Sequence, residues 1–266
     1  MTDLASLLLK SAFACYLLSA SLYLVHVTVR RPVFWRAAFG LVLIGFGLHT
    51  FCLGLRWYLA GYLPVTNLFS TLFFFSWALA ATYLYFELRY RIHASGLFIM
   101  LLNLLLLGTA LTRDAAPRPL IPALDTPLFT LHIVFSFLGY AFFAMAFSIG
   151  LLYLLQKRLY TPLLPDLILL RQLNEESIFL GFCLFTLCMI FGGIWAYIAW
   201  GYYFSWNIKG LWSFLIWLFY GGMCHAKFVR RWQGTGYALL SMAGFGIVLF
   251  TYLGIGLLLS SNHPLD

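Results

Sequence analysis

An aromatic stretch between two hydrophobic segments is the first candidate for chemistry in this sequence. Residues 192–207 hold three tryptophans, three tyrosines and three glycines but no charged side chain. Tryptophan and tyrosine also gather at membrane interfaces as anchors, so an ordinary interfacial belt is the alternative interpretation. A connector with this many rings and no charge favours a platform for a flat, apolar, aromatic ligand, and haem is the first candidate.

Two histidines accompany the aromatic stretch. His132 lies near the start of one hydrophobic segment, and His263 follows the end of another. Imidazole is a common protein ligand of haem iron. If both residues lie at the membrane face that carries the aromatic stretch, they could supply the two axial ligands of one iron. The alternative is an interfacial histidine on each helix, hydrogen-bonded to water.

The other four histidines have different settings. His225 lies inside a hydrophobic segment, thirteen residues after Trp212, which corresponds to about 20 Å along a helix. Ionisable residues inside a membrane span are functional candidates by default, but a position near the cytoplasmic end of the helix explains His225 equally well. His49 is also inside a hydrophobic segment, and we interpret it as a packing residue. His26 and His93 adjoin basic connections, and we interpret both as interfacial residues.

Hydrophobic segments of membrane-spanning length cover the whole chain. Of its 266 residues, 63% are hydrophobic and 9% are charged, and no polar region is long enough for a sizeable soluble domain. A helix needs about 20 apolar residues to cross the hydrocarbon core, whereas barrel strands would alternate every second residue. The sequence therefore predicts an all-α polytopic membrane protein with about eight transmembrane helices in one bundle. The predicted spans are residues 5–28, 37–59, 66–86, 95–112, 129–153, 177–199, 211–226 and 236–260.

Basic residues are concentrated in alternate connections. The net charge is +8, but because the cations are spread over these connections, we expect no nucleic-acid partner. The positive-inside rule places connections rich in Lys and Arg in the cytoplasm. Both termini and the aromatic stretch are then predicted to lie on the outer face. The cations that follow the first, third, fifth and seventh spans are Arg30, Arg31, Arg36, Arg89, Arg91, Lys157, Arg158, Arg171, Lys227, Arg230 and Arg231.

Two connections are longer than the others. Residues 112–128 contain four prolines, which predicts an extended outer loop. Residues 155–176 end in an amphipathic piece, 167–176, which we expect to lie on the inner membrane surface. The five cysteines all lie inside hydrophobic segments, and no C-x-x-C-H motif occurs, so the chain itself carries no covalently attached haem.

Residues 200–212 carry a recognisable motif, W-G-Y-Y-F-S-W-N-I-K-G-L-W. The spacing matches, without a gap, the approximate pattern W-G-x-x-W-x-W-D-P-K-E-x-W of the tryptophan-rich "WWD" loop. His132, His225 and His263 stand where proteins with this loop have their three histidines. The chain therefore resembles, over nearly its whole length, the CcsA family of cytochrome c biogenesis proteins, which belongs to a haem-handling superfamily.

The motif also departs from the family pattern. Phe204 replaces a tryptophan, Asn207 replaces the aspartate, Ile208 replaces the proline and Gly210 replaces the glutamate. Phe204 keeps a stacking face, and Asn207 keeps its hydrogen bonds but loses a charge. HemX, a related membrane protein tied to the control of haem biosynthesis, also has a degraded loop.

The resemblance implies a single transmembrane haem-handling domain over residues 1–266, in which residues 192–212 form an external WWD-like loop. It implies that haem b is bound, delivered to the outer membrane face and attached covalently to apocytochrome c, the assembly route called system II. It further implies axial iron ligation by His132 and His263, with His225 at a site within the membrane. Aromatic faces would bury porphyrin surface at about 25 cal/mol per Å². The other candidates for haem contact are Trp195, Trp200, Phe204, Trp206, Asn207 and Trp212.

The resemblance also implies partners and a location. The partners would be a CcsB-like membrane protein and apocytochrome c, whose C-x-x-C-H thiols would add across the haem vinyl groups. The location would be the bilayer of the bacterial inner (plasma) membrane, with the WWD-like loop facing the periplasm or exterior. The sequence leaves open whether this chain is itself an enzyme, and the resemblance is compatible with a subunit of a cytochrome c haem lyase.

Two other functions stay open at the level of sequence. One is a HemX-like, non-catalytic membrane regulator of haem biosynthesis, which the departures in the loop favour. The other is an electron-transfer cytochrome b with permanent haems between its helices. That function needs facing histidine pairs inside the bundle, and only His49 and His225 are candidates.

Overall fold

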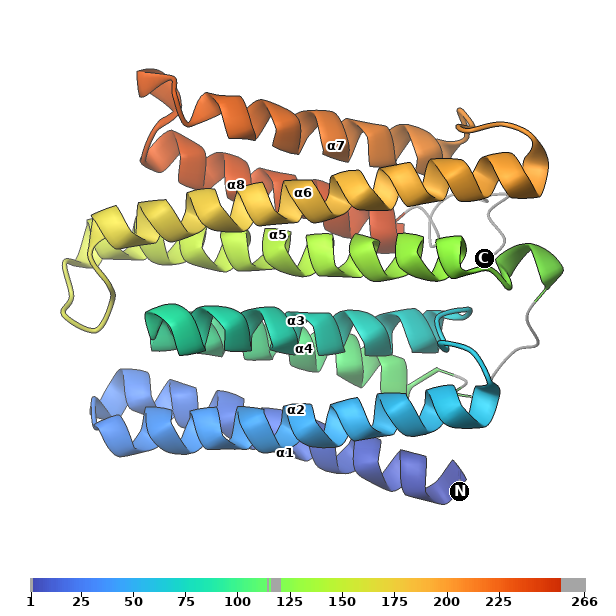
Figure 1. Cartoon of the computed structure of the whole chain (residues 1–266). Helices are drawn as coiled ribbons and strands as arrows, with labels where there is room; N and C mark the ends of the chain where they lie inside the picture. Colours follow the sequence, from blue (N-terminus) through green and yellow to red (C-terminus); the bar gives the residue numbers. More distant parts are fainter. Residues whose placement is uncertain (1, 114, 116–120, 255–266) are drawn as a thin grey trace. The chain divides into compact units, whose positions relative to one another are not determined.

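The structure is a computed structural model that describes residues 2–113, 115 and 121–254, and all regular structure among them is helical (Figure 1). Long apolar runs without a two-residue alternation form helices rather than strands, so the all-α prediction is confirmed. The helices are α1 Thr2–Val29, α2 Pro32–Ala60, α3 Leu68–Tyr90, α4 His93–Leu111, α5 Pro127–Leu159, α6 Leu167–Trp200, α7 Ile208–Ala226 and α8 Thr235–Leu249; the short turns are η1 Pro122–Leu124, η2 Arg230–Trp232 and the π-helical η3 Phe250–Gly254.

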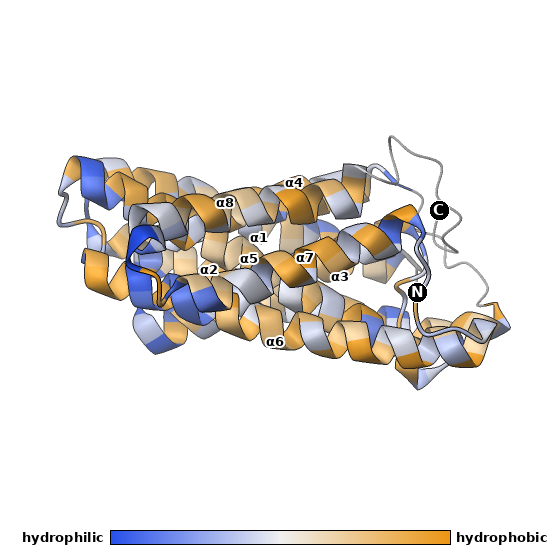
Figure 2. Cartoon of the chain, turned by 90° about the horizontal axis from the view of Figure 1, so that it is seen from above, coloured by the Kyte–Doolittle hydropathy of each residue, from blue (hydrophilic) through white to orange (hydrophobic). Residues whose placement is uncertain are grey.

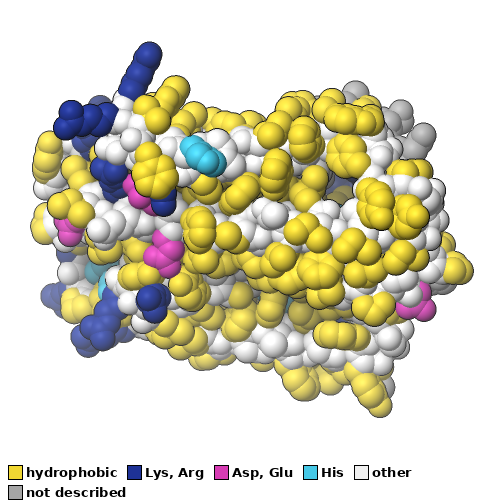
Figure 3. Space-filling model, turned by 45° about the horizontal axis from the view of Figure 1, so that its top comes forward, with side chains coloured by type: hydrophobic (Ala, Val, Ile, Leu, Met, Phe, Trp, Pro, Cys, Tyr) yellow, Lys and Arg dark blue, Asp and Glu magenta, His cyan; other side chains and the backbone are white. Residues whose placement is uncertain are grey.

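Seven of the described helices are long and apolar enough to cross a membrane, namely α1 to α6 and α8 with its η3 extension. The chain is therefore a multi-pass membrane protein. Hydrophobic colour runs along the middle of the helices, and hydrophilic colour gathers toward their ends (Figure 2). Hydrophobic side chains also cover most of the face drawn in Figure 3, and the Lys and Arg side chains visible there gather at one side of the view. Helix α7 follows the predicted span 211–226 but is not among the seven, and the orientation of the termini stays a prediction.

Helices α5 and α6 are longer than a bilayer requires. They have 33 and 34 residues, which corresponds to about 50 Å each, whereas the hydrocarbon core is about 30 Å thick. The expectation that residues 167–176 lie separately on the membrane surface is wrong, because α6 runs without a break from Leu167. Leu170, Leu173 and Asn174 are buried, so the apolar side of this piece packs against other helices.

The chain divides into two compact units. Unit 1 comprises residues 1–118 and 161–164, with α1 to α4, and unit 2 comprises residues 119–160 and 165–266, with α5 to α8. In unit 1, α1 and α3 each pack on both α2 and α4. In unit 2, α5 packs on α6 and α8, and α7 packs on the same two helices. A single haem-handling domain over the whole chain stays a prediction.

Buried polar pairs hold the helices of each unit in register. In unit 1, Ser76 Oγ donates to Asn103 Oδ1 at 2.9 Å and Asn103 Nδ2 donates to Ser76 O at 2.8 Å, which joins α3 to α4. In unit 2, Asn174 Nδ2 on α6 contacts Ala146 O on α5 at 3.2 Å and Ser241 Oγ on α8 at 3.1 Å. Because an unpaired polar group costs several kcal/mol in hydrocarbon, such pairs oppose sliding of one helix past another.

Candidate functional site

The aromatic segment joins α6 to α7 in unit 2. Helix α6 ends at Trp200, and Gly201 follows in the left-handed conformation, with φ 82°, where its N–H closes the last turn. Helix α7 begins after Asn207, whose side-chain oxygen accepts a hydrogen bond at 2.7 Å from the backbone N–H three residues later. Of the WWD-like stretch 192–212, only residues 201–207 lie outside helices, so helix ends position most of its rings.

The rings of this segment pack on one another. The Trp195 and Trp200 rings meet edge to face with 4.7 Å between centroids. The rings of Tyr197 and Tyr203 stack at 4.4 Å with 8° between their planes, which folds the loop back onto the last turn of α6. Further edge-to-face pairs join Phe204 to Trp206, Trp206 to Phe214, and Trp212 to Phe250.

The rings of this segment differ in solvent exposure: one is buried and supports the segment, and the others lie at the surface. Trp195 is only 4% exposed, and its Nε1 donates to Ala123 O at 2.7 Å, so it braces the segment from inside unit 2. Trp206 is 75% exposed and Trp200 is 42% exposed. Large exposed aromatic patches are typical of ligand, partner or membrane contacts. The outer rings are therefore available to a flat apolar ligand. They also include Tyr197, Tyr202 and Tyr203.

His132 lies beside the aromatic segment, in the second turn of α5. Its Nδ1 is 3.0 Å from the carbonyl oxygen of Cys188 on α6. A carbonyl oxygen only accepts, so Nδ1 carries the proton and the lone pair is on Nε2. The part of the chain that the structure describes offers no hydrogen bond to Nε2. The imidazole also lies 6.1 Å from the Trp195 ring, with 21° between the planes.

Gly192 makes room for the His132 ring. A Cβ atom at this position would overlap Nδ1 of His132. Gly192 lies one helical turn after Cys188 and almost one turn before Trp195, so three neighbouring residues of one face of α6 form the seat of the imidazole. The close approach of α5 and α6 therefore fixes both the tautomer and the position of His132.

The chain matches a family model described as "Cytochrome C assembly protein" over residues 65–263, which is most of its length. It belongs to the cytochrome c assembly protein family. The resemblance to this family that the sequence motifs indicate is thereby confirmed, and the protein has a role in cytochrome c biogenesis.

Relatives of this cytochrome c assembly protein differ widely in length. It is 33% identical over 225 residues to Protein NrfI of Wolinella succinogenes. The aligned region covers 82% of this chain but only 25% of NrfI. It is 31% identical over 252 residues to the cytochrome c biogenesis protein CcsA of Trieres chinensis, covering 80% of this chain and 81% of that protein. It is also 28% identical to CcsA of a Synechocystis species, in an alignment that covers 99% of this chain and 98% of that protein.

A solved structure shares the fold of this assembly protein. The chain named "Cytochrome c Heme Lyase CcmF" superposes with a TM-score of 0.73 at 17% sequence identity. The match covers 94% of the present chain and 46% of that chain. The chain therefore spans most of the length of these two CcsA relatives but about a quarter of NrfI and about half of CcmF, so activities of those longer proteins do not transfer to it directly.

The structure places His225, the ligand predicted within the membrane, apart from the aromatic segment. His225 is exposed in the last turn of α7, where its Nδ1 contacts Gly221 O at 2.9 Å. It lies thirteen residues, or about 20 Å, along α7 from Trp212. The aromatic segment is at the other end of that helix. His263 lies outside the described residues.

Asn207 and Trp212 have structural roles at the start of α7. Asn207 caps the helix, which is a position that asparagine and aspartate fill equally well. Trp212 is half-buried, and its ring packs against Phe250 at 4.8 Å, so the aromatic segment reaches the end of α8. Phe204 is half-buried within the loop.

The donor set of this assembly protein suits haem better than a bare metal ion. Within residues 2–113, 115 and 121–254, no group of three or more His, Cys, Asp and Glu side chains could hold a metal. Iron that already has four porphyrin nitrogens needs only axial ligands, and one imidazole nitrogen can provide one. Lys209, in the first turn of α7, is the cation nearest in sequence to the loop.

Sequence reasoning missed that His93 of unit 1 is paired with an acidic residue. It lies at the start of α4 as an interfacial residue would, but its Nδ1 contacts the carboxylate of Glu87 on α3. A signal was available, because Glu87 is the only acidic residue between Asp3 and Asp114 and lies at the end of an apolar segment.

Proposed function

We propose that this protein binds haem b at the aromatic segment of unit 2 and delivers it at the outer membrane face for covalent attachment to apocytochrome c. The observation that carries the proposal is the packing and hydrogen bonding of the His132 ring against α6. Its Nδ1 is occupied by the Cys188 carbonyl, which leaves Nε2 as an iron ligand beside an uncharged aromatic surface. Membership of the cytochrome c assembly family supports haem as the cargo.

The axial ligands would come from the two outer histidines. His132 provides one, and we assign the other to His263, which follows α8 in sequence. The faces of Trp200, Phe204, Trp206 and Trp212 would cover the porphyrin, while Trp195 holds the imidazole in place. His225 would make a separate contact within the membrane, since about 20 Å of α7 lies between it and Trp212.

The attachment itself would join a cysteine thiol of apocytochrome c to a haem vinyl group. The S–H and the C=C π bond break, and a C–S bond and a C–H bond form, so no oxidant or reductant is consumed. This chain would contribute position and exclusion of water rather than a reacting side chain. A CcsB-like membrane partner would complete the assembly, with this chain as a subunit of a cytochrome c haem lyase in the bacterial inner membrane.

The alternative is a HemX-like regulator without attachment activity, and one observation favours it. A Cβ atom at Gly210 would overlap the carbonyl oxygen of Ser205, so this loop conformation excludes the glutamate that the family pattern has there. Asn207 also lacks the family's charge. Deletion of the gene distinguishes the two functions, because loss of a haem lyase subunit abolishes cytochrome c maturation, whereas loss of a regulator leaves it intact.

Haem binding is tested with the purified full chain. We expect the wild-type protein to take up haem with the absorption spectrum of bis-imidazole ligation, and His132→Ala to weaken binding at least tenfold, with partial rescue by added imidazole. His26→Ala is the matched control, because His26 is a half-buried histidine of unit 1 whose Nδ1 contacts the carbonyl of Arg31. Identical spectra and affinities for wild type and His132→Ala would remove His132 from the site.

A further inference from the structure

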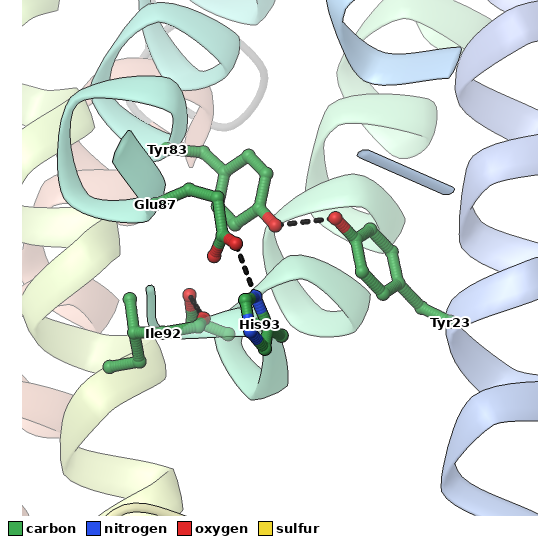
Figure 4. Close-up of polar contacts among 6 residues, drawn as sticks. Tyr23, Tyr83, Glu87, Ile92 and His93 are labelled. Carbon is green, nitrogen blue, oxygen red and sulfur yellow. Dashed lines mark hydrogen bonds and ion pairs between the residues drawn. The ribbon is translucent and has the colours of Figure 1, made fainter. Parts of the chain in front are cut away.

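A second imidazole of this protein is also prepared for ligation, at one end of unit 1. There the end of α1, the start of α2 and the α3–α4 connection meet, and we call this region the basic end of unit 1. Figure 4 shows Glu87 and His93 facing each other across the α3–α4 connection, with Tyr23 and Tyr83 beside them. The arginines of this region are Arg30, Arg31, Arg36, Arg89 and Arg91.

The carboxylate of Glu87 fixes the orientation of His93. Glu87 is 3% exposed, and His93 is 24% exposed. Because a carboxylate oxygen accepts, Nδ1 of His93 carries the proton and donates it toward Glu87 Oε1. The lone pair of His93 is then on Nε2, the ring nitrogen that does not contact the carboxylate. Among the described residues no side chain or carbonyl is hydrogen-bonded to Nε2.

Aromatic contacts hold the rest of the pair in place. The Trp35 ring at the start of α2 stacks on the His93 ring, with 3.6 Å between centroids and 14° between planes. Behind the pair, Tyr23 of α1 and Tyr83 of α3 share a hydrogen bond of 2.5 Å. A Cβ atom at Gly96 would lie 2.7 Å from both of these tyrosines, so glycine is required for α4 to approach them. All four helices of unit 1 thus support one imidazole.

This donor set suits an iron that already has other ligands. Metal-binding histidines commonly donate their second N–H to a carboxylate, which orients the ring and raises its basicity. One imidazole is too few for a bare ion, and no cluster of three metal-binding side chains occurs in the part of the chain described here. Haem iron needs only an axial ligand, because the porphyrin supplies four nitrogens.

The surrounding charge also fits haem. Glu87 is the only acidic residue of this region, and it is already paired with His93. The five arginines leave an excess of positive charge, and the Arg36 guanidinium lies 5.6 Å from the centroid of the same Trp35 ring that covers His93. A porphyrin with two propionates carries the complementary charge.

We infer that His93, backed by Glu87, is an axial iron ligand of a second haem-binding site at the basic end of unit 1. This inference rests on the proposed function, because it assumes that the protein handles haem. With the membrane orientation given by the positive-inside rule, the second site faces the cytoplasm and the aromatic segment faces outward. The site would therefore receive haem on the side opposite to its delivery.

Haem titration of the full-length protein in lipid nanodiscs tests the second site. Ferric haem is added to wild type, His132→Ala, His93→Ala and the double variant, and bound equivalents are counted from the Soret band. His225→Ala is introduced into all four proteins, so that the separate contact proposed for His225 does not add to the count. We then expect two equivalents for the otherwise wild-type protein, one for each single variant and none for the double variant. Glu175→Ala in the His132→Ala background breaks only the part-exposed Arg171–Glu175 pair of unit 2, so it is the control and should keep its one equivalent.

The possible results separate the two hypotheses. A single wild-type equivalent that is lost with His132→Ala but kept with His93→Ala would overturn the second site and leave the proposed function standing. A single equivalent that is lost with His93→Ala alone would support the second site and overturn the one at the aromatic segment. No uptake by wild type would overturn both.

Two further variants control for misfolding of His93→Ala and test the role of Glu87. His93→Ala leaves a buried carboxylate unpaired, so the pair Glu87→Gln with His93→Gln removes both charges together and should fold without the second site. In the His132→Ala background, Glu87→Gln should retain haem but raise its midpoint potential, because an amide draws less negative charge onto the imidazole. An unchanged potential would show that Glu87 does not act through a bound His93.

Discussion

The seats of His132 in unit 2 and His93 in unit 1 use the same device with different acceptors. Each imidazole donates from Nδ1 and leaves Nε2 unengaged, but His132 faces the neutral carbonyl of Cys188, whereas His93 faces the buried carboxylate of Glu87. A carboxylate makes the imidazole a stronger donor to ferric iron than a carbonyl does. The difference suggests tighter retention of ferric haem at the basic end of unit 1 and easier release at the aromatic segment.

The two seats also differ in what surrounds them. The residues packed around His132 are Cys188, Gly192 and Trp195, none of them charged, so the ring is held by close packing and a neutral hydrogen bond. His93 is held by charge, in a region with five arginines and one glutamate. Substitutions should therefore act differently at the two histidines: loss of the carboxylate breaks an ion pair at His93, whereas an added methyl group crowds the ring of His132.

The largest effect is expected from breaking the charge pair in unit 1. Glu87→Ala should destabilise the protein by about 1.5–3 kcal/mol, because it removes a hydrogen bond to a buried carboxylate and leaves the Nδ1–H of His93 without its acceptor. Glu175→Ala is the matched control: it breaks the part-exposed Arg171–Glu175 pair of α6 at 2.9 Å, and should cost at most about 0.5 kcal/mol. Denaturant unfolding in detergent measures both, and equal costs would show that Glu87 contributes no more than a surface pair.

A smaller effect is expected from crowding the seat in unit 2. Gly192→Ala places a methyl group against His132 Nδ1 and should cost about 1–3 kcal/mol, the usual range for overpacking. Haem at the aromatic segment should weaken in parallel, since the ring loses its contact with Cys188. Gly222→Ala on α7 meets no atom within 4 Å and should be neutral or stabilising by up to about 1 kcal/mol. A Gly192→Ala protein as stable as the control, with unchanged haem affinity, would contradict a seat fixed by shape.

Much of the helical fold could be predicted from apolar segment length. The spans 37–59 and 129–153 lie inside α2 and α5, because twenty or more apolar residues leave no other structure in a bilayer. The beginning of α6 could not be placed in this way. Its first turns begin with four apolar residues, 167–170, and continue with mostly polar ones, 171–176. Whether the apolar side of such a piece meets a membrane surface or another helix depends on the packing partner.

The candidate sites were predictable only in part. The spacing of residues 200–212 identified the loop, and His132 followed from it. The contact of His132 with Cys188 joins residues 56 positions apart on different helices, which no local pattern reveals. The Glu87–His93 pair depends on Arg91, which takes the left-handed conformation, with φ 55°, and turns α4 back toward α3. Few non-glycine residues adopt that conformation, so the sequence favours no such turn there.

The smallest effect is expected from giving the aromatic segment a carboxylate of its own. Asn207→Asp should change the free energy of unfolding by at most about 1 kcal/mol, because both residues cap helices and the added charge lies at the positive end of the α7 dipole. Asn207→Ala, which removes the cap, should cost about 1 kcal/mol and serves as the control.

The effect of Asn207→Asp on cytochrome c maturation is more informative than its effect on stability, because it shows whether a charge at the aromatic segment matters for function. If the family's aspartate contributes charge to attachment, mature cytochrome c detected by haem staining should increase in cells that carry Asn207→Asp. If the neutral segment is instead adapted to hold haem by shape alone, the extra charge should leave the yield unchanged or lower it. In that case, the departure at this position belongs to a loop with a different task, as the HemX-like alternative requires.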